Sequence, residues 1–454
     1  MLSAADNELL TQTGADAPMG GLFRRFWMPV LLSQELPDPD CPPVRVKIMG
    51  EELVAFRDSE GRVGLVDPRC PHRGANLFFG RNEQCGLRCA YHGWKFDVTG
   101  RCVDLPTLPP DSTFRDRVRI TAYPVREWGD FVWVYLGPAG PLPALPDLEF
   151  ALVPPAHRFV SKKLQQCNWA QAAEGGIDTA HFSFLHMPVT ASDSESDEIM
   201  RRSSADRDRT RWMRDDPMPE FQVVPHEAGL LIGASRRADG TGLYWRVSQF
   251  LMPNHGLAPN AFAGENYHGQ TWVPITDERC WVYCYTWNPE RPLTETERQR
   301  LRAGQSVHAA VDERWVPLRN RDNDYLIDRV DQKLRTFTGI RGISEQDACI
   351  QDSQGFIADR AREHLGPTDA AIIQFRRLML GAARDLRGGV EPAAARNAAA
   401  YSVRSGSALA DRSVPFPDVM VRRFGEAVGR VGRAPAGAQA SSATYSRPPS
   451  SLRG

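Results

Sequence analysis

The amino-acid sequence predicts an α+β protein with two domains. The first is built mainly of short antiparallel strands, and the second combines an antiparallel sheet with helices. Short segments in which apolar and polar residues alternate, as in half-buried strands, recur along the chain. Segments with the periodicity of helices occur only in its second part. A length of 454 residues also exceeds what one hydrophobic core usually organises.

The first domain is predicted from strands and turns. Residues 44–65 alternate apolar and polar positions around the turn-forming sequence at 58–61, a pattern that predicts a β-hairpin. Two more short strands are expected at about 117–123 and 130–135. The first domain should therefore be a small structure of short strands.

Composition marks the boundaries between the parts of the chain. A proline-rich stretch at 137–150 predicts a linker. We therefore place the N-terminal segment and the first domain at 1–140, with a core at 27–136, and the second domain at 141–432. The last residues, 433–454, are small, polar and rich in proline, which is typical of a disordered tail.

The second domain mixes helical and strand patterns. A helical pattern runs from about 165 to 186 and ends before Pro188, whereas residues 190–216 are polar enough to predict a solvated loop. Helical patterns return after Pro292 and are strongest at 369–383. Between them, alternating segments predict an antiparallel sheet from four strands, at 229–235, 243–251, 268–274 and 280–287.

Composition also excludes several classes of protein. The formal net charge is −1, so no overall field would attract nucleic acid or an anionic membrane. No apolar run approaches the roughly 18 residues that a membrane span needs, and the start of the chain lacks the apolar core of a signal peptide. We therefore expect a cytoplasmic protein. Nine cysteines in that compartment argue against a disulfide framework.

Four of those cysteines lie within one short stretch, together with two histidines. Cys70 and His72 form one knuckle, and Cys89 and His92 form another. A [2Fe–2S] cluster in which one iron binds two cysteines and the other binds two histidines needs this arrangement, because each knuckle then gives one ligand to each iron. The spacing therefore predicts such a cluster.

A zinc site is the main alternative, because two cysteines and two histidines also suit Zn²⁺. Zinc knuckles usually pair two cysteines against two histidines, however, whereas each knuckle here holds one of each. Cys85 and Cys102 could act as alternate ligands, but neither has a histidine at knuckle spacing. We expect both to be packing residues.

A second metal site is predicted further along the chain. In a helix, Glu174, Asp178 and His181 fall at i, i+4 and i+7 and share one face. His186 reaches the same metal only if the helix ends there, which Pro188 favours. Isolated histidines near a helix end usually do no chemistry, but a nearby carboxylate and a cluster in the same chain favour a metal. Two histidines and a carboxylate form a triad that leaves positions on Fe(II) open for O₂.

With both motifs, the chain resembles the oxygenase components of Rieske non-haem iron oxygenases, most closely the phthalate dioxygenase type, over about residues 7–430. The similarity includes the metal motifs at 70–100 and 168–181 and the segments at 18–27 and 342–366. The resemblance implies an antiparallel Rieske domain followed by a catalytic domain of the helix-grip, Bet v1/START-like type. It also implies one Rieske [2Fe–2S] cluster and one mononuclear non-haem iron.

The resemblance implies roles for single residues as well. The four knuckle residues would bind the cluster, and His181 and His186 would bind the mononuclear iron. Asp178 would be the carboxylate that links the cluster of a neighbouring subunit to this iron, so electrons would cross between subunits of a homotrimer or of stacked trimers. We predict Asp347 as the third iron ligand, with Asp352 as the alternative.

The activity that the resemblance implies is cis-dihydroxylation of an aromatic carboxylate such as phthalate, with O₂ and electrons from NADH. An O-demethylase or monooxygenase of a methoxylated or aryl-ether aromatic acid is the alternative, because the same metals run both reactions. A Rieske electron carrier without oxygenase activity belongs to a different class. A separate NADH-dependent flavin and iron–sulfur reductase is expected, since no G-x-G-x-x-G follows a strand in this chain.

Arginine is the natural bidentate partner of a substrate carboxylate. Arg246, in a predicted strand among aromatic residues, and Arg207, in the polar loop, are the first candidates for this role. Arg209, Arg236 and Arg237 are also considered. Any one of these arginines is more often a solvated surface charge than a ligand.

Asn168 has two interpretations. It could contact O₂ or an iron-bound water as part of the substrate site, or it could cap the helix that follows. The remaining histidines are expected to do no chemistry: His157, His226, His255, His268, His308 and His364.

Overall fold

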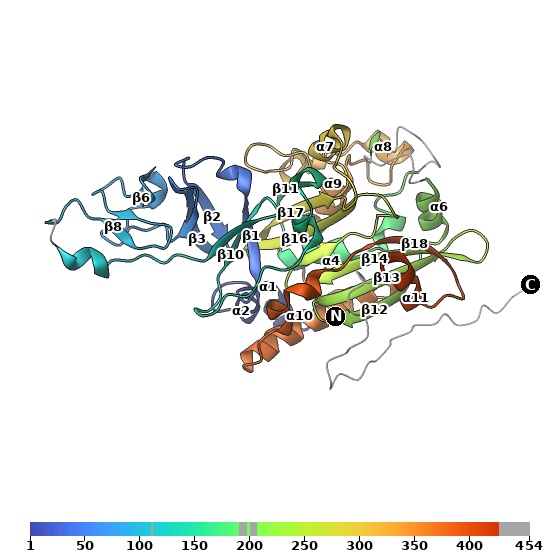
Figure 1. The fold of residues 1–454 in the computed structure, drawn as a ribbon. Helices are drawn as coiled ribbons and strands as arrows, with labels where there is room; N and C mark the ends of the chain where they lie inside the picture. Colours follow the sequence, from blue (N-terminus) through green and yellow to red (C-terminus); the bar gives the residue numbers. More distant parts are fainter. Residues whose placement is uncertain (110–111, 190–197, 200–206, 426–454) are drawn as a thin grey trace, which may run out of the picture.

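The computed structural model describes residues 1–109, 112–189, 198–199 and 207–425. Figure 1 shows two parts side by side, a smaller one on the left, drawn in blue and cyan, and a larger one on the right that holds the long sheet and most of the helices. The chain is therefore α+β with antiparallel sheets, as predicted. No helix among the described residues is long and apolar enough to cross a membrane.

Three small antiparallel sheets form the smaller part. Their strands are β1 (Trp27–Leu32), β2 (Val44–Ile48), β3 (Glu51–Arg57), β4 (Val63–Val66), β5 (Arg81–Glu83), β6 (Gly86–Arg88), β7 (Lys95–Phe96), β8 (Cys102–Asp104), β9 (Val125–Trp128) and β10 (Phe131–Tyr135). The strand orders are β1-β10-β9, β2-β3-β4 and β5-β6-β7-β8. Fully buried Phe56, Leu87 and Phe96 pack between these strands.

The hairpin predicted at 44–65 is a meander of three strands with two turns. The turn between β3 and β4 is where the sequence predicts it, and the Asp58 side chain accepts hydrogen bonds from the amides of Glu60 and Arg62. An additional turn at Met49 and Gly50, both with positive φ, joins β2 to β3. The prediction missed this turn because the alternation of apolar and polar residues continues through it.

The strand predicted at 117–123 is wrong, whereas the strand predicted at 130–135 is confirmed as β10. Residues Thr113–Arg117 form a 3₁₀ helix, and the segment after it makes only isolated bridges, at Arg119 and Ala122. The alternating pattern arises because Val118, Ile120 and Ala122 pack against buried apolar residues of the smaller part, although no strand pairs with this segment continuously. The linker predicted at 137–150 contains no strand, and a helix begins only at its end.

Two N-terminal helices were not predicted, α1 (Ala4–Thr11) and α2 (Pro18–Phe23). Both pack against α10 (Ala370–Arg387) of the larger part, beside which Figure 1 shows them. Ser3 caps α1 by accepting a hydrogen bond from the amide of Asp6. The N-terminal segment therefore crosses the larger part before the chain enters the smaller one.

One large antiparallel sheet dominates the second part. Its strands are β11 (Arg158–Gln165), β12 (Glu220–His226), β13 (Gly229–Arg237), β14 (Gly242–Leu251), β15 (His255–Leu257), β16 (Tyr267–Thr276), β17 (Arg279–Trp287) and β18 (Gly406–Asp411). They follow the order β11-β17-β16-β15-β14-β13-β12, and β18 pairs with β14. The four predicted strands are confirmed as β13, β14, β16 and β17. The others were not predicted, and β18 joins from almost 160 residues later in the chain, a pairing that no local pattern signals.

The remaining helices are α3 (Glu149–Leu152), α4 (Trp169–Ile177), α6 (Arg207–Asp215), α7 (Glu295–Arg302), α8 (Arg329–Leu334), α9 (Ile343–Ser353) and α11 (Phe416–Phe424). The amphipathic helix predicted at 369–383 is confirmed as α10. The loop predicted at 190–216 is wrong for its last part, because α6 buries Trp212 and Met213 beside Tyr244. The rest of that prediction, and the predicted tail at 433–454, lie outside the described residues.

Helix α4 approaches the sheet closely because of its glycines. A Cβ atom at Gly176 would lie 2.1 Å from the ring of Trp272 on β16, and one at Gly175 would meet Gln351 on α9. Only glycine permits such contacts. The helix that carries the second metal motif is thus held between the sheet and α9.

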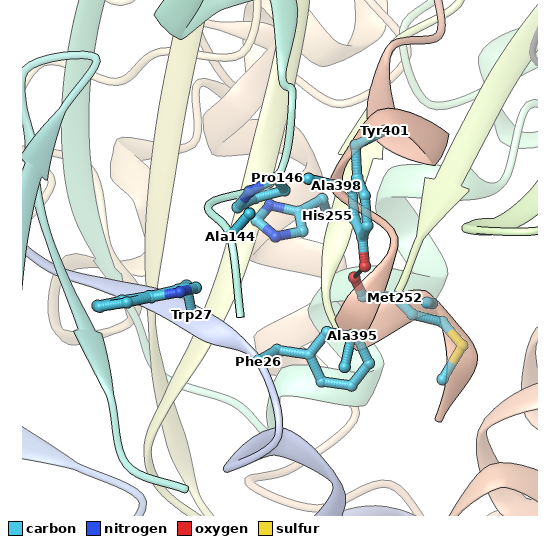
Figure 2. A pocket seen from close by; sticks show the side chains of 10 residues that line it. Phe26, Trp27, Ala144, Pro146, Met252, His255, Ala395, Ala398 and Tyr401 are labelled. Atoms are coloured by element: carbon cyan, nitrogen blue, oxygen red, sulfur yellow. Dashed lines mark hydrogen bonds between the residues drawn. The ribbon is translucent and has the colours of Figure 1, made fainter. Parts of the chain in front are cut away.

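A small pocket marks the place where the N-terminal end of β1 meets the larger part (Figure 2). Phe26 and Trp27 line it from one side, and His255 and Tyr401 line it from the other. The Tyr401 hydroxyl donates a hydrogen bond to the carbonyl oxygen of Met252. Burial lowers the pKa of His255 to about 3, so this histidine is a neutral core residue, as expected.

Candidate metal centres

The two knuckles of the smaller part have the same backbone structure. The amide of Cys70 donates to the carbonyl of Ala75, and the amide of Cys89 donates to the carbonyl of Trp94. In each loop the glycine four residues after the cysteine returns a hydrogen bond to the cysteine carbonyl and has a positive φ, 73° and 77°. A side chain at either position would strain the loop. The repeated sequence therefore folds into two matching loops.

These loops bring the four predicted cluster ligands together. The rings of His72 and His92 have centroids 4.3 Å apart, and Cys70 and Cys89 are buried in one apolar cluster. Burial, with the neighbouring Cys89, raises the pKa of the Cys70 thiol to about 11, so thiolates need a cation here. Two buried sulfurs beneath two more exposed imidazoles fit a [2Fe–2S] cluster with its histidine iron toward the surface.

Aromatic rings hold the two histidines of this set. The Trp94 indole stacks on His72 with an interplanar angle of 6°, and the Tyr91 ring lies 3.8 Å from that of His92. Cys102 is buried in the same apolar cluster as the knuckle cysteines, and Cys85 lies in a turn with positive φ. Cys102 is therefore a packing residue, whereas Cys85 is a half-buried turn residue outside that cluster.

The second motif does not form one continuous helix, so that prediction is wrong. Helix α4 ends at Ile177, and Asp178 is its C-cap with extended backbone angles. Glu174 consequently does not share a face with Asp178 and His181. Its carboxylate is buried instead between the guanidinium groups of Arg360 and Arg376. The glycines before Asp178 weaken the helix at the point where the sequence pattern alone would continue it.

After Asp178, a short 3₁₀ turn reverses the chain and brings both histidines to one point. The Nε2 atoms of His181 and His186 lie 3.1 Å apart. Asp347, from α9, places Oδ1 3.0 Å from Nε2 of His186 and 3.5 Å from Nε2 of His181. All three ligand atoms lie within 4.8 Å of one another.

Hydrogen bonds at the far side of each imidazole orient this set. Nδ1 of His181 donates to Oδ2 of Asp178 at 3.1 Å, and Nδ1 of His186 donates to Oε1 of Gln346 at 2.6 Å. With both Nδ1 atoms protonated, the two Nε2 atoms present lone pairs toward Asp347 Oδ1, which has no hydrogen-bond donor in the described parts of the chain. Three facing lone pairs fit a divalent metal such as Fe(II).

The pKa values of the neighbouring groups agree with this orientation. Burial acts to raise the pKa of Asp178, but the hydrogen bond to the His181 ring, the charge of that ring and the hydrogen bonds from the amides of Ala180 and His181 together hold that pKa below its usual value. Burial lowers the pKa of His186. Asp178 thus stays a carboxylate that can hold the proton on His181 Nδ1. Gln346 was missed in the sequence, where only its position next to Asp347 could have signalled it.

Asp352, the alternative third ligand, lies elsewhere on α9. Its carboxyl group bonds to the hydroxyl of buried Tyr325, and burial raises its pKa. Asp352 is not part of the group of ligand atoms that His181, His186 and Asp347 form. The geometry therefore favours Asp347 over Asp352.

The structure does not place all of the predicted substrate arginines beside the triad. Arg246 is buried beside the metal triad: its Nε donates to Thr179 Oγ1 at 2.8 Å, and its guanidinium lies 3.9 Å from the ring centre of Phe182. Arg209 is paired with Glu265 instead. The side chain of Arg207 lies outside the described residues.

Asn168 lies at the opposite end of α4 from the triad, so the prediction that it contacts O₂ is not supported. Its side chain caps α4 by accepting from the amide of Ala170, and it donates to the carbonyl oxygens of Thr11 and Asp277. Every polar atom of this fully buried side chain is used by these bonds. The capping interpretation therefore describes it.

Comparison with known proteins adds to this geometry. Residues 26–124 match the family model described as Rieske [2Fe-2S] domain, and residues 134–422 match the one described as LigXa C-terminal domain like. The chain is 42% identical over 399 residues to the phthalate 4,5-dioxygenase oxygenase subunit of Pseudomonas putida, covering 84% of this chain and 86% of that one.

Two further comparisons extend along most of the chain. It is 37% identical over 442 residues to the 3-chlorobenzoate-3,4-dioxygenase oxygenase subunit of Comamonas testosteroni, covering 93% of this chain and 99% of that one. The crystal structure of dicamba monooxygenase bound to dicamba matches with a TM-score of 0.55 at 17% identity, covering 81% of this chain and 99% of that one. At that identity the structural match concerns the fold.

Proposed function

The chain belongs to the Rieske non-haem iron oxygenases, and from this membership we propose that it cis-dihydroxylates an aromatic carboxylate such as phthalate. It is an oxygenase component with a [2Fe–2S] cluster and a mononuclear iron, and therefore an oxidoreductase. An electron carrier without oxygenase activity does not fit this membership. The observation that supports the proposed substrate class is the buried guanidinium of Arg246 beside the metal triad.

The residues around the two centres have separable tasks in this proposal. The four knuckle residues hold the cluster, and His181, His186 and Asp347 hold the iron. When bound, the cluster supplies electrons one at a time and the iron supplies open positions for O₂. Asp178 and Gln346 keep the protons on the Nδ1 atoms, so that both Nε2 atoms remain ligands.

Turnover with a panel of benzoates, phthalates, arenesulfonates and methoxybenzoates, supported by a surrogate reductase, tests the proposed activity. A dihydroxylase gives a cis-diol with both oxygen atoms from ¹⁸O₂. The alternative, an O-demethylase of a methoxylated aromatic acid, gives a phenol and formaldehyde. Absence of product from every aromatic acid, in protein with both metal centres filled, would contradict the proposed substrate class.

Arg246 is proposed to bind the substrate carboxylate, and its replacement should therefore weaken binding. Arg246→Gln is expected to raise KM for aromatic carboxylates about 10- to 100-fold, the value of a hydrogen bond to a charged group. Steady-state kinetics on protein of unchanged iron content measures this effect. Arg237→Gln, an exposed neighbour that is paired with Asp216, is the control and should leave KM unchanged. Arg207 stays a second predicted clamp for the same assay.

Oxygenase components of this kind work with separate electron-transfer partners, and we propose an NADH-dependent flavin and iron–sulfur reductase for this one. We also propose a homotrimer or stacked trimers. Apolar side chains are exposed at both centres, with Phe79 and Tyr91 near the cluster and Phe184 and Phe337 near the triad. Other exposed apolar side chains occur on neighbouring segments and on α8 and α9: Val189, Leu326, Val330, Leu334 and Ile350. Exposed apolar side chains that lie together often mark interfaces.

The proposed assembly makes a prediction about Phe337, which is 53% exposed and contacts Phe184. Phe337→Glu places a charge in the apolar surface and is expected to shift the protein from trimer to monomer, as measured by light scattering. The cluster spectrum should persist in the monomer. Val421→Glu, at an even more exposed apolar position on α11, is the control and should leave the assembly intact. A monomeric parent protein would refute the proposal.

A further inference from the structure

Lys163 carries a buried positive charge on the face of β11 that meets α9. It is 3% exposed, and its Nζ donates to the hydroxyl of Ser344 and, at 3.4 Å, to the carbonyl oxygen of the same residue. Among the described residues, no carboxylate lies within ion-pair distance of this Nζ. Lys162, whose side chain is on the other face of the strand, is paired with Glu35 at 2.6 Å instead. Lys163 is therefore the member of this adjacent pair whose charge has no acidic partner in the described structure.

Two side-chain contacts between β11 and α9 lie on either side of Asp347, and Figure 1 places the two elements next to each other. Lys163 bonds to Ser344, three residues before Asp347. Gln165 donates to the side chain of Gln351, four residues after Asp347. Because residues at i, i+3 and i+7 share one face of a helix, Ser344, Asp347 and Gln351 form a row along α9. The charge of Lys163 thus lies about one helical turn from the carboxylate that is proposed to bind iron.

The charge of Lys163 acts on the buried groups around it. Burial acts to raise the pKa of Asp347, but the two triad histidines, and after them Lys163, hold that pKa below its usual value. Burial raises the pKa of Asp352 and of the Cys284 thiol, and Lys163 opposes this effect at both groups. The field of this buried ammonium group therefore extends to the triad without direct contact.

A fixed positive charge near a metal site distinguishes between the oxidation states of iron. Fe(III) carries one more positive charge than Fe(II), so a neighbouring cation disfavours it more. One additional unit charge at about 10 Å, in an effective dielectric constant of about 20, changes an equilibrium constant by roughly a factor of 10. Salt screens such an effect little when the charge is buried. Lys163 should therefore favour Fe(II), the state whose open positions bind O₂.

Anchoring of α9 alone does not account for this residue. A neutral side chain can tie the same two elements together, as Gln165 does through Gln351. A buried ammonium group without an acidic partner costs free energy that a neutral donor avoids. The charge of Lys163 is therefore the feature that needs a function.

We propose that Lys163 keeps the mononuclear iron ferrous by disfavouring Fe(III), and that its bond to Ser344 positions the turn of α9 that carries Asp347. Lys163 is then a positioning residue, since it acts on the metal through its charge and through α9 without binding the metal. The proposal rests on the triad of the proposed function and is independent of the substrate class.

A redox titration of the holoprotein without substrate, followed by the EPR signal of high-spin Fe(III), tests the proposal. Lys163→Met removes the charge and keeps the length of the side chain. It should raise the affinity for Fe(III) relative to Fe(II) about 10-fold, which corresponds to a potential lower by about 59 mV. Lys163→Gln, which can still bond to Ser344 without a charge, should give the same fall. Lys163→Arg keeps the charge and should keep the parent potential.

Ser344→Ala separates the charge from the anchor. It removes the bonded hydroxyl and keeps Lys163, so a chelator should remove the mononuclear iron more readily while the potential stays near that of the parent. The proposal is overturned if Lys163→Met and Lys163→Gln both keep the parent potential, or if Lys163→Arg or Ser344→Ala lowers it equally. Mononuclear iron that persists in Asp347→Ala would remove the triad and this proposal together. An unchanged potential in protein whose iron depends on Asp347 removes only the role of Lys163.

Discussion

Replacing Asp347 with alanine is expected to give a protein that keeps the spectrum of the [2Fe–2S] cluster, binds no mononuclear iron and has no oxygenase activity. Asp347 Oδ1 is the only carboxylate oxygen among the described residues that converges with the two Nε2 atoms. Two imidazoles alone bind Fe(II) weakly, because the carboxylate also supplies the negative charge that the cation needs. Iron analysis should therefore find two irons per chain instead of three.

The matched control for this variant is Asp352→Ala, five residues further on the same helix. Its partner is the hydroxyl of Tyr325, so the variant should keep three irons per chain and lose stability instead. The opposite pattern, full iron in Asp347→Ala and loss of the mononuclear iron in Asp352→Ala, would exchange the roles of the two carboxylates.

Asp178→Asn is expected to keep both metal centres and lose most of the turnover, by about 10- to 100-fold, as changes beside metal ligands often do. The amide keeps the shape of the side chain, and it can still accept from the amide of Ala180 through one oxygen. The substitution removes the negative charge that holds the proton on His181 Nδ1. Stopped-flow oxidation of the pre-reduced cluster in a single turnover measures the effect.

Gln346 provides the comparison for Asp178, because it orients His186 without a charge. Gln346→Ala should lower the affinity for the mononuclear iron, with little effect on the oxidation of the cluster once iron is supplied in excess. Slow oxidation of the cluster that is confined to Asp178→Asn would support a link between the two centres through Asp178. Oxidation at the parent rate in Asp178→Asn would remove that role.

Local patterns predicted much of the fold. The long strands β13, β14, β16 and β17 and helix α10 each have a local pattern of residues that predicts the element without knowledge of its partners. Elements without a local signature were missed: α1 and α2 are short, and β18 depends on a partner strand far away in the chain. The prediction of a continuous helix through His181 was wrong. The helix ends before Asp178, and contacts with the sheet hold the segment that follows in a different conformation.

The sequence by itself determined the chemistry of both centres. Cys70, His72, Cys89 and His92 lie in two short loops, so their spacing specifies their geometry, and the His181–His186 pair is equally local. Only the tertiary structure decided which late carboxylate meets those histidines, and it brought Asp347 rather than Asp352 to them. It also showed that the Arg236 side chain is buried, with two nitrogens that have no hydrogen-bond partner among the described residues. Both depend on packing between segments distant in the chain, which a one-dimensional pattern does not contain.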